Sequence, residues 1–352
     1  DAPVVMGCVD SDIKKDLFSN MEWEICKDSG FVQLKKLLPL DILYLDQHND
    51  GIGGVWKDHY LAFVEFIKKN NPQHVLEIGG AHDFIAKHYL NSRSDADWTI
   101  VEPNPQHIED SRIKVIKGWF DNNFRLDTPI DAVVHSHVFE HVYEPFSFMQ
   151  HVSSFLKVGD KHIFSFPNML PMLENKFTNC LNFEHTVFLT EYFADYILKK
   201  TGFKILDKQY YGNPHSIFYA TEKVEASADV KLENKYDEYK KIFNDFINYH
   251  LEMVKDLNEK IENSQEQVYL FGAHIFSQYL IQFGLKTNKI INILDNSVLK
   301  QEKRLYGTNL LVKSPKILTD KGVVNVILKA GIYDDEIRKD ILDNVNNKVN
   351  FW

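Results

Sequence analysis

Short apolar runs alternate with segments of helical periodicity through the middle of the chain. Apolar runs of four to eight residues bounded by turn residues are typical of buried strands, and strands that alternate with helices favour a parallel sheet with right-handed crossovers. The runs that fit this description are residues 74–78, 98–101, 113–117, 130–134 and 162–166. The pattern predicts an α/β domain, which we assign to residues 56–223.

Different patterns flank this region. Residues 224–266 contain neither glycine nor proline, and their apolar positions recur three or four residues apart, which predicts one long connecting helix. Residues 267–352 return to strand, glycine turn and helix, so they predict a second, smaller α/β domain. Residues 1–55 lack this alternation and are expected to form a small irregular N-terminal domain.

An acidic residue and two glycines end the first predicted strand. Glu77 is followed by Ile78, Gly79 and Gly80. Glycine at a strand-to-helix turn lets the backbone approach a ligand without a clashing Cβ. A dinucleotide fingerprint requires G-x-G-x-x-G, and its later glycine positions are Ala81 and Phe84 here, which argues against a nicotinamide cofactor.

Polar and aromatic residues follow the next predicted strands. Glu102 ends the second strand, where a carboxylate can accept both hydroxyls of a ribose. Residues 119–121, Trp119, Phe120 and Asp121, follow the third and offer a flat wall and an acceptor for an adenine. His135 and His137 follow the fourth strand and are expected to line the same cleft.

The order of these pieces resembles the class I S-adenosylmethionine (SAM)-dependent methyltransferases. The pieces are E-x-G-G, V-E-P-N, K-G-W-F-D and H-S-H-V-F-E-H-V. The resemblance implies a class I methyltransferase Rossmann-like sheet, SAM as methyl donor and S-adenosylhomocysteine (SAH) as product. It also implies that Glu77, Gly79, Gly80, Glu102 and the residues after the third and fourth strands bind SAM.

The C-terminal region resembles one family of these enzymes more narrowly. Residues 271–274, 294–297, 303–308 and 331–337 are similar to the C-terminal domain of sugar C-methyltransferases, which act on nucleotide-linked deoxysugars. The resemblance implies that the C-terminal Rossmann-like domain helps to bind substrate, and that the partner is a small sugar or nucleotide sugar.

Members of that family begin with a zinc domain, and here its ligand pattern is degenerate. Cys26 is followed by Ser29, and Cys8 by Ser11, where second thiolates are expected. Serine is a poor substitute for a thiolate ligand of zinc. We expect the fold of this domain to persist without metal and its cysteines to be buried, although His48 and His59 offer replacement ligands.

The loop after the fifth strand carries the catalytic prediction. The family shows Y-H-E-H there, and Glu184 and His185 fall on its last two positions. The resemblance implies acid–base catalysis, with His185 as the general base because a histidine pKa lies near working pH. The family's tyrosine and first histidine are missing, and His215 is a candidate to replace that imidazole.

These departures leave several reactions open. Carbon methylation beside a ketone requires removal of a proton, oxygen methylation needs a single base, and methylation of an aminosugar nitrogen needs little more than orientation. A SAM-binding protein with weakened catalysis is a further alternative. The H-x-x-E-H run at His137, Glu140 and His141 resembles a metal motif, but its place after the fourth strand assigns it to the SAM cleft, and no metal is predicted.

The amino-acid composition restricts the kinds of molecule that the protein is expected to bind. The 352 residues carry a formal net charge of −10, whereas proteins that bind nucleic acid usually present a basic face. Three cysteines do not make a disulfide framework, and no apolar run is long enough to span a membrane. The chain is expected to be cytoplasmic, with no nucleic-acid or membrane partner, and its oligomeric state is left open.

Overall fold

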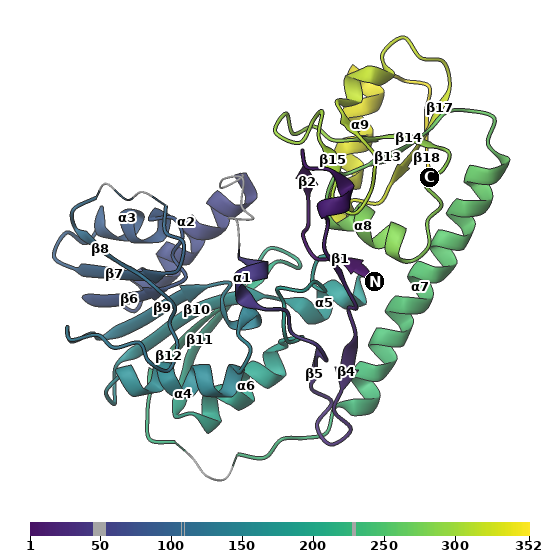
Figure 1. Cartoon of the computed structure of the whole chain (residues 1–352). Helices are drawn as coiled ribbons and strands as arrows, with labels where there is room; N and C mark the ends of the chain where they lie inside the picture. The colour runs from purple at the N-terminus through teal and green to yellow at the C-terminus, as the bar shows by residue number, and fades with distance from the viewer. Residues whose placement is uncertain (45–53, 107, 109, 227–229) are drawn as a thin grey trace.

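The computed structural model describes residues 1–44, 54–106, 108, 110–226 and 230–352. Figure 1 shows one α/β body, a smaller α/β body at the C-terminal end, and the long helix α7 (Tyr236–Asn263), which contacts both. The N-terminal segment lies between the two bodies. His48, a candidate replacement ligand, lies outside the described residues.

The larger body is built on a seven-stranded sheet in the order β11-β12-β10-β9-β6-β7-β8. The strands β6 to β10 pair in parallel, and β12 is antiparallel to both of its neighbours. This is the predicted α/β fold with the Rossmann-like sheet of class I methyltransferases. The strands are β6 (His74–Ile78), β7 (Asp97–Glu102), β8 (Ile113–Lys117), β9 (Ala132–Ser136), β10 (Lys161–Pro167), β11 (Phe203–Tyr211) and β12 (Ser216–Lys223).

Helices cover both faces of this sheet. Successive side chains of a strand point to opposite faces, and in β10 Phe164 packs in one buried cluster while Ile163 packs in the other. The covering helices are α2 (Gly54–Lys68) and α3 (Phe84–Leu90) on one face and α4 (Pro145–Phe155) and α6 (Glu191–Lys200) on the other. The short helix α5 (Met169–Glu174) packs instead in a cluster with residues of the long helix near the C-terminal domain.

The fourth predicted strand is shifted along the chain. It was expected at residues 130–134, but β9 spans Ala132–Ser136. The Asp131 carboxylate accepts hydrogen bonds from the N–H groups of Gln73 and His74, so this residue ties two chain segments together just before the strand begins. As a consequence His135 lies within the strand instead of following it.

The C-terminal body is the second α/β domain. Its five strands are all parallel, in the order β16-β14-β13-β17-β18. The strands are β13 (Val268–Phe271), β14 (Ile290–Leu294), β16 (Val312–Lys313), β17 (Val324–Leu328) and β18 (Val349–Phe351), with helices α8 (Ile275–Gln282) and α9 (Asp334–Asn344) and 3-10 turns at Pro315–Leu318 and Gly331–Tyr333.

The connecting helix α7 is shorter than predicted. It spans Tyr236–Asn263, and the described residues 224–226 and 230–235 before it are not helical. The Asn234 side chain donates to the Lys27 carbonyl and accepts from the N–H of Tyr236, so it fixes the start of the helix. Phe246 of α7 packs against the methyltransferase-like body and Leu257 against the C-terminal sheet, so one apolar face joins both bodies.

The N-terminal residues form short elements that are shared with their neighbours. They comprise β1 (Ala2–Pro3), β2 (Cys8–Val9), a 3-10 turn at Ile13–Lys15, β3 (Phe18–Ser19), β4 (Trp23–Ile25), β5 (Val32–Leu34) and α1 (Leu40–Leu43). Strand β2 pairs with β15 (Arg304–Leu305) of the C-terminal domain, and the N–H of Leu34 donates to the Thr186 carbonyl. Cys26 is exposed and Cys8 is half-buried, so the expectation of buried cysteines is wrong for these two positions.

Candidate active site

A cavity of about 590 Å³ lies at the carboxyl ends of the parallel strands β6, β7 and β9, where open α/β sheets bind ligands. Of the residues predicted from sequence to form the site, those that line the cavity are Gly79, Glu102, Trp119, Phe120, Asp121, His137 and Glu184. Its described lining does not include Glu77, Gly80, His135, His185 or His215. We call this space the donor cavity.

Gly79 and Gly80 each allow a neighbouring side chain to lie close to the backbone, but for different reasons. Gly79 has φ of +75°, and a Cβ there would lie 2.7 Å from Cγ2 of Val138. A Cβ on Gly80 would lie 2.8 Å from the carboxyl carbon of Glu77. Both positions therefore exclude a side chain, one through backbone conformation and crowding and the other through crowding alone.

The buried side chain of Glu77 packs against the glycine turn. Its side chain is 2% exposed, and its Oε2 accepts a hydrogen bond from Nε1 of Trp98 at 2.7 Å. Burial raises the Glu77 pKa to about 8. Since the carboxyl group packs beneath Gly80 and away from the cavity, Glu77 holds the turn in place and its side chain does not reach the cavity as a SAM ligand was predicted to do.

Glu102 and the segment after β8 form the other end of the donor cavity. Oε1 of Glu102 accepts from the N–H of Asn104 at 2.9 Å, and burial raises the pKa of this carboxyl. Trp119 is 43% exposed and meets Tyr44 edge to face at 5.7 Å between ring centroids. Oδ1 of Asp121 accepts from the N–H of Asn123 at 2.8 Å, which orders the turn.

His135 departs from its predicted role. Its ring is fully buried, and its Nε2 lies 2.9 Å from Nε2 of His162 in the core. Burial lowers the His135 pKa to about 3. Because β9 continues through Ser136, the ring of His135 points into the packed face of the sheet and not into the cavity.

A chain of acid and base groups borders the donor cavity after β9. Nδ1 of His137 lies 3.3 Å, and Nε2 of His141 3.5 Å, from Oε1 of the buried Glu140. Burial opposes the charge of Glu140, but hydrogen bonds from the two histidines outweigh it and hold its pKa below the usual range. Burial likewise opposes a charge on His141, yet the hydrogen bond and charge of Glu140 raise its pKa.

His141 connects this chain to the predicted catalytic loop. Its Nδ1 lies 3.3 Å from the Tyr44 hydroxyl and 3.9 Å from Oε2 of Glu184, and all three residues line the cavity. Tyr44 was not predicted, because it follows a short helix in the irregular N-terminal region and no strand-end pattern marks it.

The ring of His185 packs against that of His141, on the side away from the cavity lining. The ring centroids are 5.0 Å apart, and Nδ1 of His185 lies 2.9 Å from the Cys180 carbonyl oxygen. A carbonyl only accepts, so Nδ1 carries the proton and Nε2 the lone pair. Burial, with a smaller effect of His141, lowers the His185 pKa to about 4, which keeps this imidazole neutral at neutral pH.

His215 belongs to another group of histidines. It lies before β12, and its ring centroid is 5.1 Å from that of His59 of α2. Ser216 Oγ lies 2.6 Å from Nδ1 of His215 and 2.9 Å from Nε2 of His137. We call His59, His137 and His215 the histidine triad; His137 is its one member in the described wall of the donor cavity.

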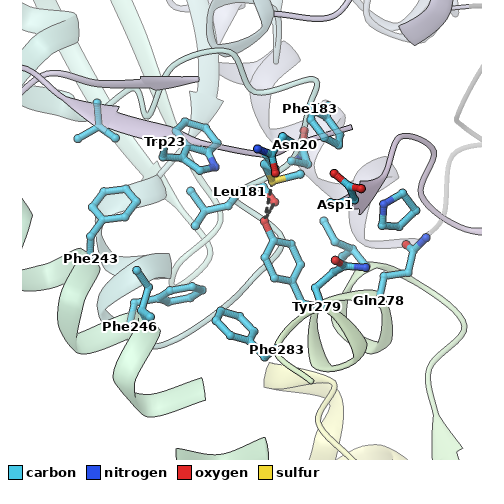
Figure 2. A pocket seen from close by; sticks show the side chains of 18 of the residues that line it. Asp1, Asn20, Trp23, Leu181, Phe183, Phe243, Phe246, Gln278, Tyr279 and Phe283 are labelled. Carbon is cyan, nitrogen blue, oxygen red and sulfur yellow. Dashed lines mark hydrogen bonds between the residues drawn. The ribbon is translucent and has the colours of Figure 1, made fainter. Parts of the chain in front are cut away.

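A second cavity, of about 520 Å³, lies between the N-terminal segment, α7 and α8. Figure 2 shows its aromatic wall, which includes Trp23, Phe183, Phe243, Phe246, Tyr279 and Phe283. The Tyr279 hydroxyl donates to the Leu181 carbonyl. Residues 181–183 line this cavity and Glu184 lines the donor cavity, so a single loop walls both spaces.

The sheet order and the glycine turn at its carboxyl edge define a class I SAM-dependent methyltransferase fold. Residues 54–208 match the family described as "Methyltransferase domain". This chain therefore contains a methyltransferase domain, and SAM is the methyl donor of that class. No helix among the described residues is long and apolar enough to cross a membrane.

Solved structures of methyltransferases are similar to part of this chain, at low sequence identity and low TM-scores. A putative SAM-dependent methyltransferase from Listeria monocytogenes is 12% identical over 47% of this chain and 100% of its own, with a TM-score of 0.38. Human N-acetylserotonin methyltransferase in complex with SAM is 14% identical over 49% of this chain and 53% of its own, with a TM-score of 0.41. A SAM-dependent methyltransferase from Mesorhizobium loti is 11% identical over 49% and 100%, with a TM-score of 0.40. The search of curated proteins found no match.

Proposed function

We propose that this protein transfers the methyl group of SAM to oxygen or carbon of a small activated sugar, most simply a nucleotide sugar. The observation that carries the proposal is the loop of residues 181–184, which walls both the donor cavity and the aromatic second cavity. A sugar at Glu184 and a nucleobase among the aromatic rings would be held by the same loop.

The donor cavity has the groups that SAM requires. The backbone at Gly79 has no Cβ, and one would crowd Val138 at the cavity wall. Glu102 offers a carboxylate for the ribose hydroxyls, and Trp119 offers a flat face for adenine. SAM supplies an electrophilic methyl group on a sulfonium. Glu77 and Gly80 act on this site indirectly by fixing the turn.

Proton removal falls to the loop and its partners. Glu184 lies on the cavity wall and makes first contact with the acceptor hydroxyl, and His141 links it to neutral His185. The Nδ1–H of His185 is held by the Cys180 carbonyl, so its Nε2 carries the free lone pair beside the ring of His141. His215, which shares Ser216 with His137, contributes by positioning His137 at the cavity wall.

The charge of the donor cavity restricts how a nucleotide sugar is bound. Among its described lining residues four are acidic and none is Lys or Arg, whereas the second cavity is lined by Lys240 and by two acidic residues, Asp1 and Glu24. Phosphates would be repelled by the acidic groups of the donor cavity. We therefore place the sugar ring alone in the donor cavity and the nucleotide in the second cavity.

The same charge distribution favours a second candidate, N-methylation of an aminosugar. Glu102, Asp121, Glu144 and Glu184 line the donor cavity, and such a surface attracts a protonated amine. An amine must lose a proton before attack, and Glu184 is placed to take it.

The experiment is product NMR with carbon-13-methyl SAM and a panel of nucleotide sugars, free sugars and aminosugars. The chemical shift and couplings of the label identify methylation on carbon, oxygen or nitrogen. A label on nitrogen would replace the first proposal by the second. SAH binding without labelled product from the whole panel would instead support a catalytically weakened SAM-binding protein.

Two variants test the loop. Glu184→Gln and His185→Gln should each lower kcat by at least about 100-fold while SAH affinity stays nearly unchanged. His74→Gln, at an exposed histidine at the start of β6, is the matched control. Normal turnover of His185→Gln would remove this residue from the mechanism.

A further inference from the structure

We propose that the histidine triad, His59, His137 and His215, binds a divalent transition-metal ion, zinc being the natural choice, at the edge of the donor cavity. One ligand atom of each residue lies within 4.8 Å of those of the other two. Three imidazoles and one open position are a common catalytic zinc arrangement. Neutral nitrogen ligands of this kind select zinc, copper, nickel or iron over magnesium or calcium.

The strongest observation is at His59. Its side chain is 0% exposed, and neither ring nitrogen has a hydrogen-bond partner among the described residues. Burying a polar group without a partner costs free energy, and such groups are rare in folded proteins. Because the ring packs against His137 and His215, a metal ion among the three would give His59 the partner that it lacks.

The backbone holds His137 in an unusual conformation. Its φ is +53°, in the left-handed region that residues with a Cβ rarely adopt. Strain of this kind persists where the surrounding structure requires a side chain to point in one direction. Here it places the His137 ring against His59 and in the wall of the donor cavity.

Side chains next to the three histidines orient their rings, as the neighbours of ligating residues do in metal sites. Glu140 lies 3.3 Å from Nδ1 of His137, and a carboxylate behind a ligating histidine fixes its tautomer and leaves the other nitrogen for the ion. Trp56 packs edge to face against all three rings, with centroids 4.8 to 5.3 Å away, and holds them together on one side.

The distances fit an ion after small adjustments. Zinc–nitrogen bonds of about 2.0–2.1 Å in a tetrahedron place the nitrogens about 3.3 Å apart. The hydroxyl of Ser216 now contacts both His137 and His215, so ion binding would turn these two rings away from it and toward His59.

The location of the triad suggests what the ion would do. At His137 its open position borders the donor cavity, so it could hold and polarise a hydroxyl or carbonyl oxygen of the acceptor. This role rests on the proposed function, whereas the metal site itself does not.

The test uses the full chain without substrate, so its outcome is independent of the methylation reaction. The protein is treated with chelator, dialysed, and titrated with Co²⁺ while the visible absorption of tetrahedral cobalt is followed; Zn²⁺ is then added in competition. We expect one Co²⁺ per chain, displaced by Zn²⁺. Absence of binding by folded protein would overturn the proposal.

Variants locate the ion. His59→Gln and His215→Gln should each weaken Co²⁺ binding by about 100-fold or more, and His74→Gln should leave it unchanged. His215 is half-buried in a turn, so its variant keeps the test valid if the buried His59 variant fails to fold. Binding that survives His215→Gln but is lost in His185→Gln would move the ion to the neighbouring cluster of Glu140, His141 and His185, and would refute the triad.

Discussion

Arg304 of the C-terminal domain and Asp16 of the N-terminal segment form a buried, two-pronged ion pair. Nη1 of Arg304 lies 2.6 Å from Oδ2 of Asp16, and Nη2 lies 2.5 Å from Oδ1. Asp16 also accepts from the N–H of Gly307, and Nε of Arg304 donates to the Ser11 carbonyl. The pair fastens the N-terminal segment, which walls the second cavity, to the C-terminal domain.

Removing one charge of this pair should destabilise the protein. Asp16→Asn leaves a buried guanidinium without its counter-charge, and breaking a buried pair in this way costs about 3 kcal/mol. The free energy of unfolding, measured by urea denaturation, should fall by that amount. Asp10→Asn, at an exposed aspartate of the same segment, should have no measurable effect. Equal stability of the two variants would show that the pair does not hold the segment.

Gly79 should be essential for SAM binding. Gly79→Ala adds a Cβ at a φ of +75° and 2.7 Å from Val138, so the turn must move. We expect SAH affinity, measured by calorimetry, to fall at least about 10-fold. Gly322→Ala has an ordinary φ and open space around its Cβ, and it should bind SAH like the parent. Unchanged binding by the Gly79 variant would place the cofactor elsewhere.

Glu102 should bind the ribose through its charge. Glu102→Gln keeps an oxygen to accept from the N–H of Asn104 but removes the carboxylate. Hydrogen bonds to charged groups contribute about 1.5–3 kcal/mol, so SAH affinity should fall about 10- to 100-fold. The same calorimetric titration with adenine alone should show little change, because only the ribose contact is lost. A loss of adenine binding of equal size would mean that the substitution disturbs the whole cavity.

Glu77 should make stability depend on pH. Its pKa is raised from 4.5 in the open chain to about 8 in the folded protein, so the folded state keeps a proton that the unfolded state releases. This contribution to stability is complete below about pH 4.5 and is lost as pH rises toward 8, by on the order of 4 kcal/mol.

Glu77→Gln isolates this effect. The amide can still accept from Trp98 and has no charge to bury. The variant should gain stability relative to the parent as pH is raised from 5 to 8, measured by urea denaturation at each pH. A stability difference that does not change with pH would show that Glu77 is not protonated in the folded protein.

The sequence determined the local parts of this protein. The strands at residues 74–78 and 113–117 form as predicted, because apolar runs and turn residues act over a few neighbouring residues. The carboxyl ends of parallel strands share one edge of a sheet, so Gly79, Glu102 and Trp119 meet in one cavity as expected. The resemblance to methyltransferases rested on these same residues.

Tertiary packing decided what local pattern could not. A shift of β9 along the chain puts His135 in the core, and desolvation makes Glu77 a support of the turn. His59, His137 and His215 come from a helix, a strand end and a turn far apart in sequence, so no spacing reveals their cluster. Glu184 and His185 are neighbours in the chain, yet only Glu184 lies in the described cavity wall, because burial depends on what packs against each side chain and not on its position in a motif.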